Sequence, residues 1–406
     1  MKWKKLLSFL LVLGVPLLLF VPGNAAGMNT EATTAKDLPS ALSLPEILEE
    51  QERSIDLGEI ERFLQEVDRE IGAFFPAGSV KEFIAKFAAG EIDLAPQEMF
   101  RQFMVYFWRE VLLNLSLLGK LLLVAVVCAI LSTIQSAFEQ GTVAKVAYFV
   151  CFLVVMTLAV GSFKLAISTG LGVIEKMVGF MQVLLPVLLV LLTALGGLTT
   201  VSLLQPFLMV FLSTLSIGCQ NIVFPFISLT AVLGLANNLS EHFKISQLVS
   251  FFKQLTKVGI GFVLTLFIGV ITVEGVAGSV IDGVTLRTAK FMTGAFVPVA
   301  GNMFADALDA VIGGSLLLKN ALGLAGLLIL GALVLFPVLK ILALAVIYRF
   351  ASALLQPLGD SLLANTFEEM AGCLFLTFAV VAAVAIMFFL TLAIIVGTAN
   401  FTVMLR

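Results

Sequence analysis

The chain has 406 residues, of which 60% are hydrophobic and 13% charged, with a mean hydropathy of +1.09 and a formal net charge of −3. Few soluble folds could bury so much apolar surface, so this composition excludes an ordinary soluble globular protein and indicates a membrane protein. The acidic residues are unevenly spread, since 17 of the 27 Asp and Glu lie in residues 27–110, together with 8 Lys and Arg. An acidic front part therefore precedes a more apolar body.

The N-terminus has the three parts of a secretory signal peptide. A basic start, residues 2–5, precedes a 16-residue apolar run, residues 6–21, and small residues follow. Cleavage after Ala25 fits this pattern, and an uncut membrane anchor is the alternative. Residues 1–25 are thus predicted to be a signal peptide, and residues 26–110 are expected on the extracytoplasmic side in either case.

Residues 26–110 carry the pattern of amphipathic helices. In residues 59–71 the apolar side chains recur at three- and four-residue spacing, which predicts one buried helix face. A second such run follows at 80–87, and a third, 99–108, ends in three aromatic residues, as is typical of a membrane interface. We interpret this part as an acidic helical domain outside the membrane. It serves either as a cap over the membrane part or as a docking surface for a partner.

The body, residues 111–406, is predicted to be an all-α, polytopic membrane domain. A span needs about 20 apolar residues, so about seven to eight spans are expected. The candidate runs are 111–134, 146–168, 177–198, 203–236, 257–280, 321–348 and 370–397. Proline removes a backbone donor and clashes with the preceding turn, so four prolines are predicted helix breaks: Pro186, Pro225, Pro298 and Pro337.

The same four prolines suggest an internal repeat. Pro186 and Pro225 are 39 residues apart, as are Pro298 and Pro337, and the two pairs are offset by 112 residues. Transporters are often built from such repeats, with binding sites where broken helices meet. Apolar segments also align by chance, so a true duplication and a chance periodicity both stay open.

The segment 285–323 lies between two long apolar runs and carries five spaced ionisable residues among mostly small and apolar ones. It is too polar to cross a bilayer as one ordinary helix and too apolar for a water-exposed loop, so a broken or re-entrant helix is predicted. Such backbone survives at membrane depth only where protein or cavity water satisfies its polar groups. Its ionisable residues are therefore expected to line a protein-enclosed polar cavity or channel, with an ordinary extramembrane loop as the alternative: Arg287, Lys290, Asp306, Asp309 and Lys319.

Two further ionisable residues, Glu274 and Lys340, lie inside apolar runs. Such groups are costly at membrane depth unless they are paired or hydrated. One hypothesis joins them in a structural ion pair, and another makes either of them part of a polar path. Snorkelling to an interface is the alternative, which is easier for Lys340 than for Glu274.

Signatures of catalysis are missing from the sequence. There is one histidine, His242, and the four cysteines lie singly in apolar runs without CxxC spacing. No phosphate-binding loop and no basic, aromatic patch for nucleic acid is present. We therefore expect a protein that is not an enzyme, with no cofactor, no metal and no nucleic-acid partner.

Short motifs between residues 288 and 360 carry a family resemblance. They are TAKF (288–291), FVPVAG (296–301), DALDAV (306–311), GGSLLLKNALG (313–323), FPVLK (336–340) and QPLGD (356–360). With the signal peptide, the acidic helical part and the polytopic body, they make the whole chain resemble the stage III sporulation protein AE family. Two departures are conservative: Ala305 stands in place of the usual Ser before Asp306, and Ala310 in place of the usual Thr after Asp309.

The resemblance implies a place in endospore formation. It implies the polytopic subunit of a mother-cell membrane complex that, with stage II sporulation protein Q on the forespore side, resembles a secretion apparatus or channel. The implied partners are the other membrane proteins of the stage III sporulation A complex, with lipid around them, in the mother-cell membrane around the forespore. A self-sufficient secondary transporter, with a substrate site at broken helices, is the alternative, which the possible repeat and Glu274 favour.

Overall fold

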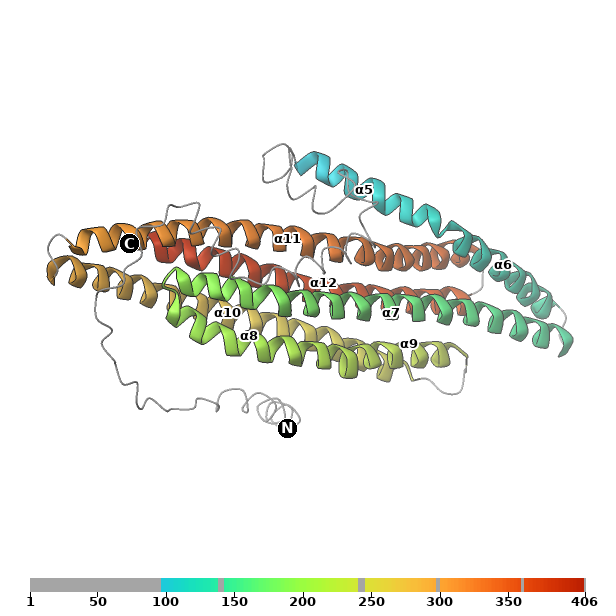
Figure 1. Ribbon diagram of the computed structural model, residues 1–406. Helices are drawn as coiled ribbons and strands as arrows, with labels where there is room; N and C mark the ends of the chain where they lie inside the picture. Colours follow the sequence, from blue (N-terminus) through green and yellow to red (C-terminus); the bar gives the residue numbers. More distant parts are fainter. Residues whose placement is uncertain (1–95, 138–141, 240–244, 297–299, 359–360, 405–406) are drawn as a thin grey trace, which may run out of the picture. The chain divides into compact units, whose positions relative to one another are not determined.

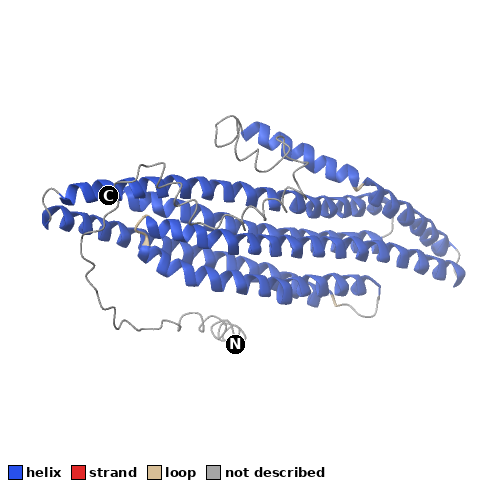
Figure 2. Ribbon diagram, in the orientation of Figure 1, coloured by secondary structure: helices blue, strands red, loops and turns tan. Residues whose placement is uncertain are grey.

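The computed structural model describes residues 96–137, 142–239, 245–296, 300–358 and 361–404, and these residues are almost entirely helical (Figure 1; Figure 2). The all-α fold class is confirmed for them, while the predictions for the signal peptide and for most of the acidic part fall outside the described residues. In chain order the elements are α5 (Pro96–Leu113), α6 (Leu115–Ala137), α7 (Thr142–Ala194), α8 (Leu198–Gly218), the π-helix η3 (Cys219–Val223), α9 (Phe224–Leu239), α10 (Ser246–Phe296), α11 (Ala300–Leu355), the 3-10 helix η4 (Gln356–Leu358) and α12 (Ser361–Met404).

Four of these helices are much longer than one bilayer crossing. Helices α7, α10, α11 and α12 have 53, 51, 56 and 44 residues, against the about 20 that the hydrocarbon core of a bilayer requires. At about 1.5 Å per residue, α11 is about 84 Å long. Helix is the expected state of such apolar sequence, because a chain in lipid must satisfy its backbone hydrogen bonds within itself.

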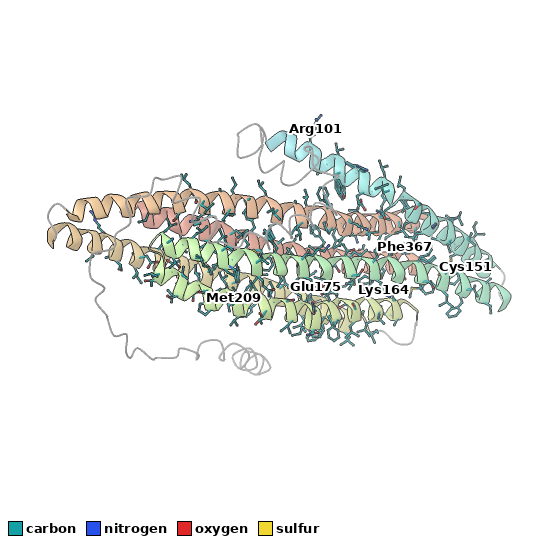
Figure 3. All side chains as sticks on the ribbon, in the orientation of Figure 1. Arg101, Cys151, Lys164, Glu175, Met209 and Phe367 are labelled. Carbon is teal, nitrogen blue, oxygen red and sulfur yellow. The ribbon has the colours of Figure 1, made fainter. Side chains whose placement is uncertain are left out.

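The number of membrane spans differs from the prediction. Among the described residues five helices are long and apolar enough to cross a membrane, or up to six if the bent pair Met104–Leu113 and Leu115–Ile130 forms one span, so the seven to eight expected are not confirmed. The predicted span 146–168 and most of the predicted span 177–198 belong to the single helix α7, which ends at Ala194. The polar residues between them do not interrupt it, since Glu175 accepts a hydrogen bond from Gln220 Nε2 at 2.8 Å and remains on the helix surface (Figure 3).

The prolines do not act as predicted. Helices α7 and α11 continue through Pro186 and Pro337, so the prediction of breaks at these two positions is wrong. Helices in lipid tolerate proline because neighbouring helices and local adjustments satisfy the freed backbone groups. At Pro225 the adjustment is visible: η3 precedes it, and the N–H of Phe224 donates to the carbonyl of Cys219, five residues back. Pro298 lies in 297–299, outside the described residues.

A glycine pair makes the tight connection between α7 and α8. Gly196 has a φ of 83°, in the left-handed region that favours glycine. Its N–H donates to the carbonyl of Thr193 at 2.9 Å, and the N–H of Gly197 donates to that of Leu192 at 3.0 Å, which is the Schellman arrangement. A Cβ at Gly197 would lie 2.8 Å from the carbonyl oxygen of Leu192, so both positions require glycine.

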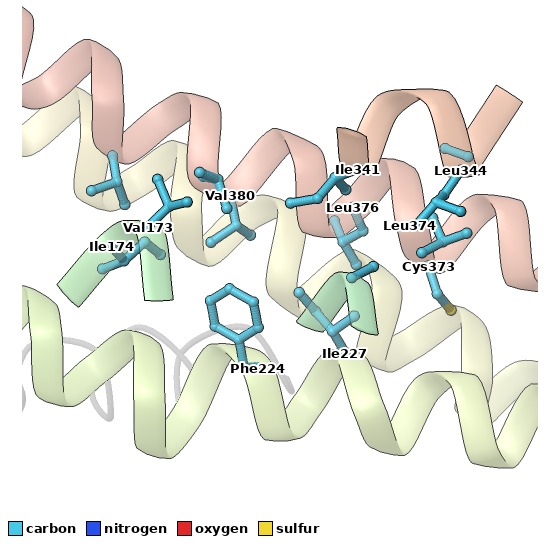
Figure 4. Packing of buried hydrophobic residues seen from close by; sticks show 14 of the residues in the cluster. Val173, Ile174, Phe224, Ile227, Ile341, Leu344, Cys373, Leu374, Leu376 and Val380 are labelled. Atoms are coloured by element: carbon cyan, nitrogen blue, oxygen red, sulfur yellow. The ribbon is translucent and has the colours of Figure 1, made fainter. Parts of the chain in front are cut away.

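The core lies where α7, α9, α11 and α12 meet. Figure 4 shows Phe224 and Ile227 of α9 facing apolar side chains of α7 and α12, and all belong to one buried cluster. Tyr348 of α11 is fully buried, shares a hydrogen bond with the hydroxyl of Ser162 in α7 and packs edge-on against Phe367 of α12 at 5.7 Å between ring centroids. The buried tyrosine thus ties three helices together while its hydroxyl stays satisfied.

The outer faces of the helices are apolar. Only 17% of the apolar stretch of α10 is buried, against 50% for α12, so α10 is the most peripheral of the five candidate spans. Its exposed side chains include Leu248, Phe262 and Val284. Exposed apolar faces on several long helices fit hydrocarbon rather than water, so the chain is a multi-pass membrane protein.

Candidate functional site

The polar segment 285–323 is helical on both sides of a short connection. Its first part is the end of α10, which runs to Phe296, and its last part is the start of α11 at Ala300. The described residues of this segment therefore belong to the ends of two long helices, α10 and α11. Arg287 is exposed on α10. The other side chains expected to line a cavity here lie outside the described residues: Lys290, Asp306 and Asp309.

Lys319 is fully buried between α11 and α12. Its ammonium group donates to the backbone carbonyls of Ile395 at 3.2 Å and Val396 at 2.9 Å. The two helices touch closely here, because a Cβ at Gly323, one turn further along α11, would lie 2.2 Å from a methyl group of Val396. No carboxylate among the described residues forms an ion pair with Lys319. Two carbonyl dipoles therefore compensate the buried charge.

Glu274 lies on α10 beside the same turn of α12. Its neighbour Gly275 packs so tightly that a Cβ there would lie 2.8 Å from Ile394 and 3.2 Å from Thr398. The Oε2 atom of Glu274 is buried and has no hydrogen-bond partner. Glu274 and Lys319 thus flank one turn of α12 without forming an ion pair within the described residues.

The structure does not bring Glu274 and Lys340 together. Lys340 is half-buried on α11 and lies 21 residues beyond Lys319, which is about 30 Å along the helix. Glu274 remains at the level of Lys319, next to the turn of α12 around Ile395. The hypothesis of a structural Glu274–Lys340 ion pair is therefore wrong for this arrangement of the helices.

Asp282 is a buried carboxylate that the sequence analysis did not single out. Its Oδ1 accepts from the N–H of Thr199 at 2.8 Å, and its Oδ2 accepts from the N–H and hydroxyl of Thr200 at 2.9 and 2.7 Å. These N–H groups belong to the first turn of α8, where the N-cap residue Gly197 has no side chain to offer. Asp282 of α10 therefore caps the N-terminus of α8. The positive end of the α8 helix dipole also favours the negative charge of this carboxylate.

Gly278 makes this capping contact possible. It lies one turn before Asp282 on α10, and a Cβ there would lie 2.7 Å from Thr200 Oγ1 and 2.8 Å from Thr200 Cα. Only glycine lets the start of α8 come this close. An acidic residue four positions after a glycine, at the end of an apolar run, was the available signal in the sequence. We call Glu274, Asp282, Lys319 and Thr200 the polar cluster.

A second set of charges lies toward the start of α12. Lys253 of α10 forms an ion pair with Glu369, and Arg349 of α11 forms one with Glu368. The side chains of Lys253 and Glu369 are only 23% and 31% exposed, whereas those of Arg349 and Glu368 are largely exposed. The first pair therefore links α10 to α12 in a partly desolvated position, and the second contributes little.

The polar cluster has the features of a structural or ion-handling site. Two of its charged groups, Glu274 and Asp282, come from α10, and Lys319 comes from α11. Each is compensated differently: Asp282 by backbone N–H groups and a hydroxyl, Lys319 by carbonyls, and Glu274 by no described group. Within the described ranges no group of three or more His, Cys, Asp and Glu residues could hold a metal ion. Cys128, Cys219 and Cys373 are buried.

Comparison with known proteins gives a consistent result. The family model described as stage III sporulation protein AE matches residues 78–399. The stage III sporulation protein AE of Bacillus subtilis (strain 168) is 37% identical over 405 residues, which cover 100% of this chain and 99% of that protein. No solved structure matches the chain significantly.

Proposed function

The chain belongs to the stage III sporulation protein AE family, and from this premise we propose that it is a membrane subunit of a channel or secretion-like complex between mother cell and forespore. A role in sporulation follows from the family, and the multi-pass membrane character from the apolar helices. The proposal adds the location in the mother-cell membrane, an extracytoplasmic N-terminal part, and partners from the stage III sporulation A complex, linked through them to stage II sporulation protein Q. It assigns no catalytic activity.

The observation that carries the proposal is the exposed apolar face of α10. Exposed apolar side chains run along it from Leu248 to Val284, 36 residues apart and thus about 54 Å along the helix. Even a helix tilted by about 40° crosses a hydrocarbon core of about 30 Å within roughly 40 Å of its length. Lipid tails alone therefore leave part of this face uncovered, which supports contact with other membrane proteins.

The alternative of a self-sufficient transporter has less support. The possible repeat and Glu274 favoured it, with a substrate site at broken helices, but α7 and α11 continue through Pro186 and Pro337. At the 112-residue offset, Pro225, in the first turn of α9 after the π-helix η3, would correspond to Pro337 inside the continuous helix α11. These positions have different structural settings, so the helices do not support a duplication.

Purification from sporulating cells tests the proposal. The tagged full chain, extracted in mild detergent, should co-purify with other stage III sporulation A proteins in a fixed stoichiometry. Recovery of the chain alone, with transport activity after reconstitution, would favour the transporter instead.

Two glycine variants locate the contact. Gly261 and Gly269 lie exposed on α10, and a Cβ at either meets nothing within 4 Å, so Gly261→Leu and Gly269→Leu leave the packing of this chain unchanged. Each should reduce co-purification at unchanged membrane levels. Gly161→Leu, equally open on α7, is the matched control. Unchanged assembly in both α10 variants would remove this face from the interface.

A further inference from the structure

Glu274 is half-buried and lies near the middle of α10. The nearest exposed cations on α10 are Lys257 and Arg287, at 17 and 13 residues from it, which correspond to about 25 and 20 Å along the helix. A glutamate side chain is much too short to reach either end of this interval. Snorkelling to a membrane interface therefore does not account for Glu274.

Among the described residues, no charged group forms an ion pair with Glu274. Helices α8 and α9 contain no charged residue, and the charged residues of α12, Glu368 and Glu369, lie far from its turn around Ile394. On α10 itself, Asp282 is occupied by the first turn of α8. The facing cation on α11 is Lys319, which donates to α12 carbonyls, and the side chains of Asp306 and Asp309 lie outside the described residues.

The packing on both sides of Glu274 is close. Gly275 fits against Ile394 of α12, and Gly278 fits against Thr200 of α8. About two turns earlier on α10, Phe267 stacks on Phe211 of α8 with ring centroids 4.0 Å apart. Glu274 therefore lies between two tight contacts, and its buried Oε2 receives no hydrogen bond.

Burying a carboxylate oxygen without a hydrogen-bond donor is costly, and protonation of the carboxyl group removes the charge. We propose that Glu274 is a proton-binding site of the membrane bundle, protonated while α10 is packed against α8 and α12. When these helices separate, the carboxylic O–H bond breaks, the proton passes to an entering water molecule, and the carboxylate remains. The chain can thus couple the separation of α10 to proton release, independently of which partners surround it.

Carbodiimide labelling of the full chain in lipid vesicles tests this protonation state. Dicyclohexylcarbodiimide is apolar and reacts with protonated carboxyl groups in apolar surroundings. At neutral pH, peptide mass spectrometry should find Glu274 modified several-fold more than Glu369, which is paired with Lys253, and more than the exposed Glu175. Labelling of Glu274 at or below the level of Glu175 overturns the proposal.

Infrared and thermal measurements on Glu274→Gln give an independent answer. The difference spectrum between wild type and this variant should contain the carbonyl band of a protonated carboxylic acid at neutral pH, and the variant should keep the wild-type Tm. An ionised Glu274 paired with Lys319 gives carboxylate bands only. In that case Glu274→Gln and Lys319→Gln each lower the Tm, the double variant is no worse than either, and the proposal is wrong.

Discussion

Asp282 of α10 caps α8 through Thr200, which lies 82 residues earlier in the chain. The carboxylate binds both the N–H and the hydroxyl of Thr200, while Gly278 keeps the two backbones in contact. The start of α8 follows directly on the Gly196–Gly197 turn. The N-cap residue Gly197 has no side chain that could accept hydrogen bonds from the first N–H groups of α8. A carboxylate at the positive end of a helix dipole is the fitting partner for them.

Asp282→Ala should therefore destabilise the bundle. It removes three hydrogen bonds and leaves buried N–H groups without an acceptor, which should cost about 2 kcal/mol or more. Thermal unfolding in detergent measures the effect, and Thr200→Val should add little to it in a double-mutant cycle. The control is Ser202→Ala, since the exposed Ser202 hydroxyl bonds only the carbonyl of Leu198 in its own helix. Additive effects of Asp282→Ala and Thr200→Val would show that the two residues act separately.

Two glycines of α10 should respond in opposite directions to alanine. Gly278→Ala places a methyl group 2.7 Å from Thr200 Oγ1 and should cost about 1–3 kcal/mol through overpacking. Gly269→Ala meets nothing within 4 Å and should stabilise the isolated chain by about 0.5–1 kcal/mol, because alanine favours helix. Tm values of the purified variants give the comparison. Equal Tm values would mean that α8 and α10 do not approach this closely.

Lys319 should be replaceable by an apolar side chain of similar length. Its ammonium group is buried without a carboxylate partner, so Lys319→Met removes a desolvation penalty together with two hydrogen bonds. The net change in stability should stay within about 1.5 kcal/mol. Lys319→Ala leaves a cavity instead and should cost about 2–5 kcal/mol. If Lys319→Met unfolds the chain while Lys340→Met does not, the charge itself holds α11 to α12.

The acidic N-terminal part should react from outside the cytoplasm. Ser54→Cys in a chain without other cysteines places a thiol in residues 26–110, within the segment expected to be extracytoplasmic. A membrane-impermeant thiol reagent should label it in intact protoplasts. Lys340→Cys, within the apolar part of α11, is the negative control. Labelling of Ser54→Cys only after lysis would reverse the assigned side.

The sequence by itself determined that the chain is a helical membrane protein, because both properties depend on the local run of apolar residues. Apolar runs longer than a bilayer requires specify helices wherever lipid surrounds the backbone, and the motifs up to residue 360 identified the family. Local rules also produced the errors: proline was expected to break α7 and α11, yet both helices continue because lipid-embedded helices can satisfy the freed backbone groups through their neighbours. Lys319 and Glu274 stand out in the sequence because ionisable residues are rare and costly in such apolar stretches.

Only the tertiary structure decided what these groups contact. Lys319 meets carbonyls 76 and 77 residues away, and Asp282 meets N–H groups 82 and 83 residues away. In lipid every face of a helix is apolar, so hydrophobic patterning does not specify which faces meet or in which register. Close approach at single glycines such as Gly275, Gly278 and Gly323 sets that register. The partner of each buried charge then follows from the packing of whole helices.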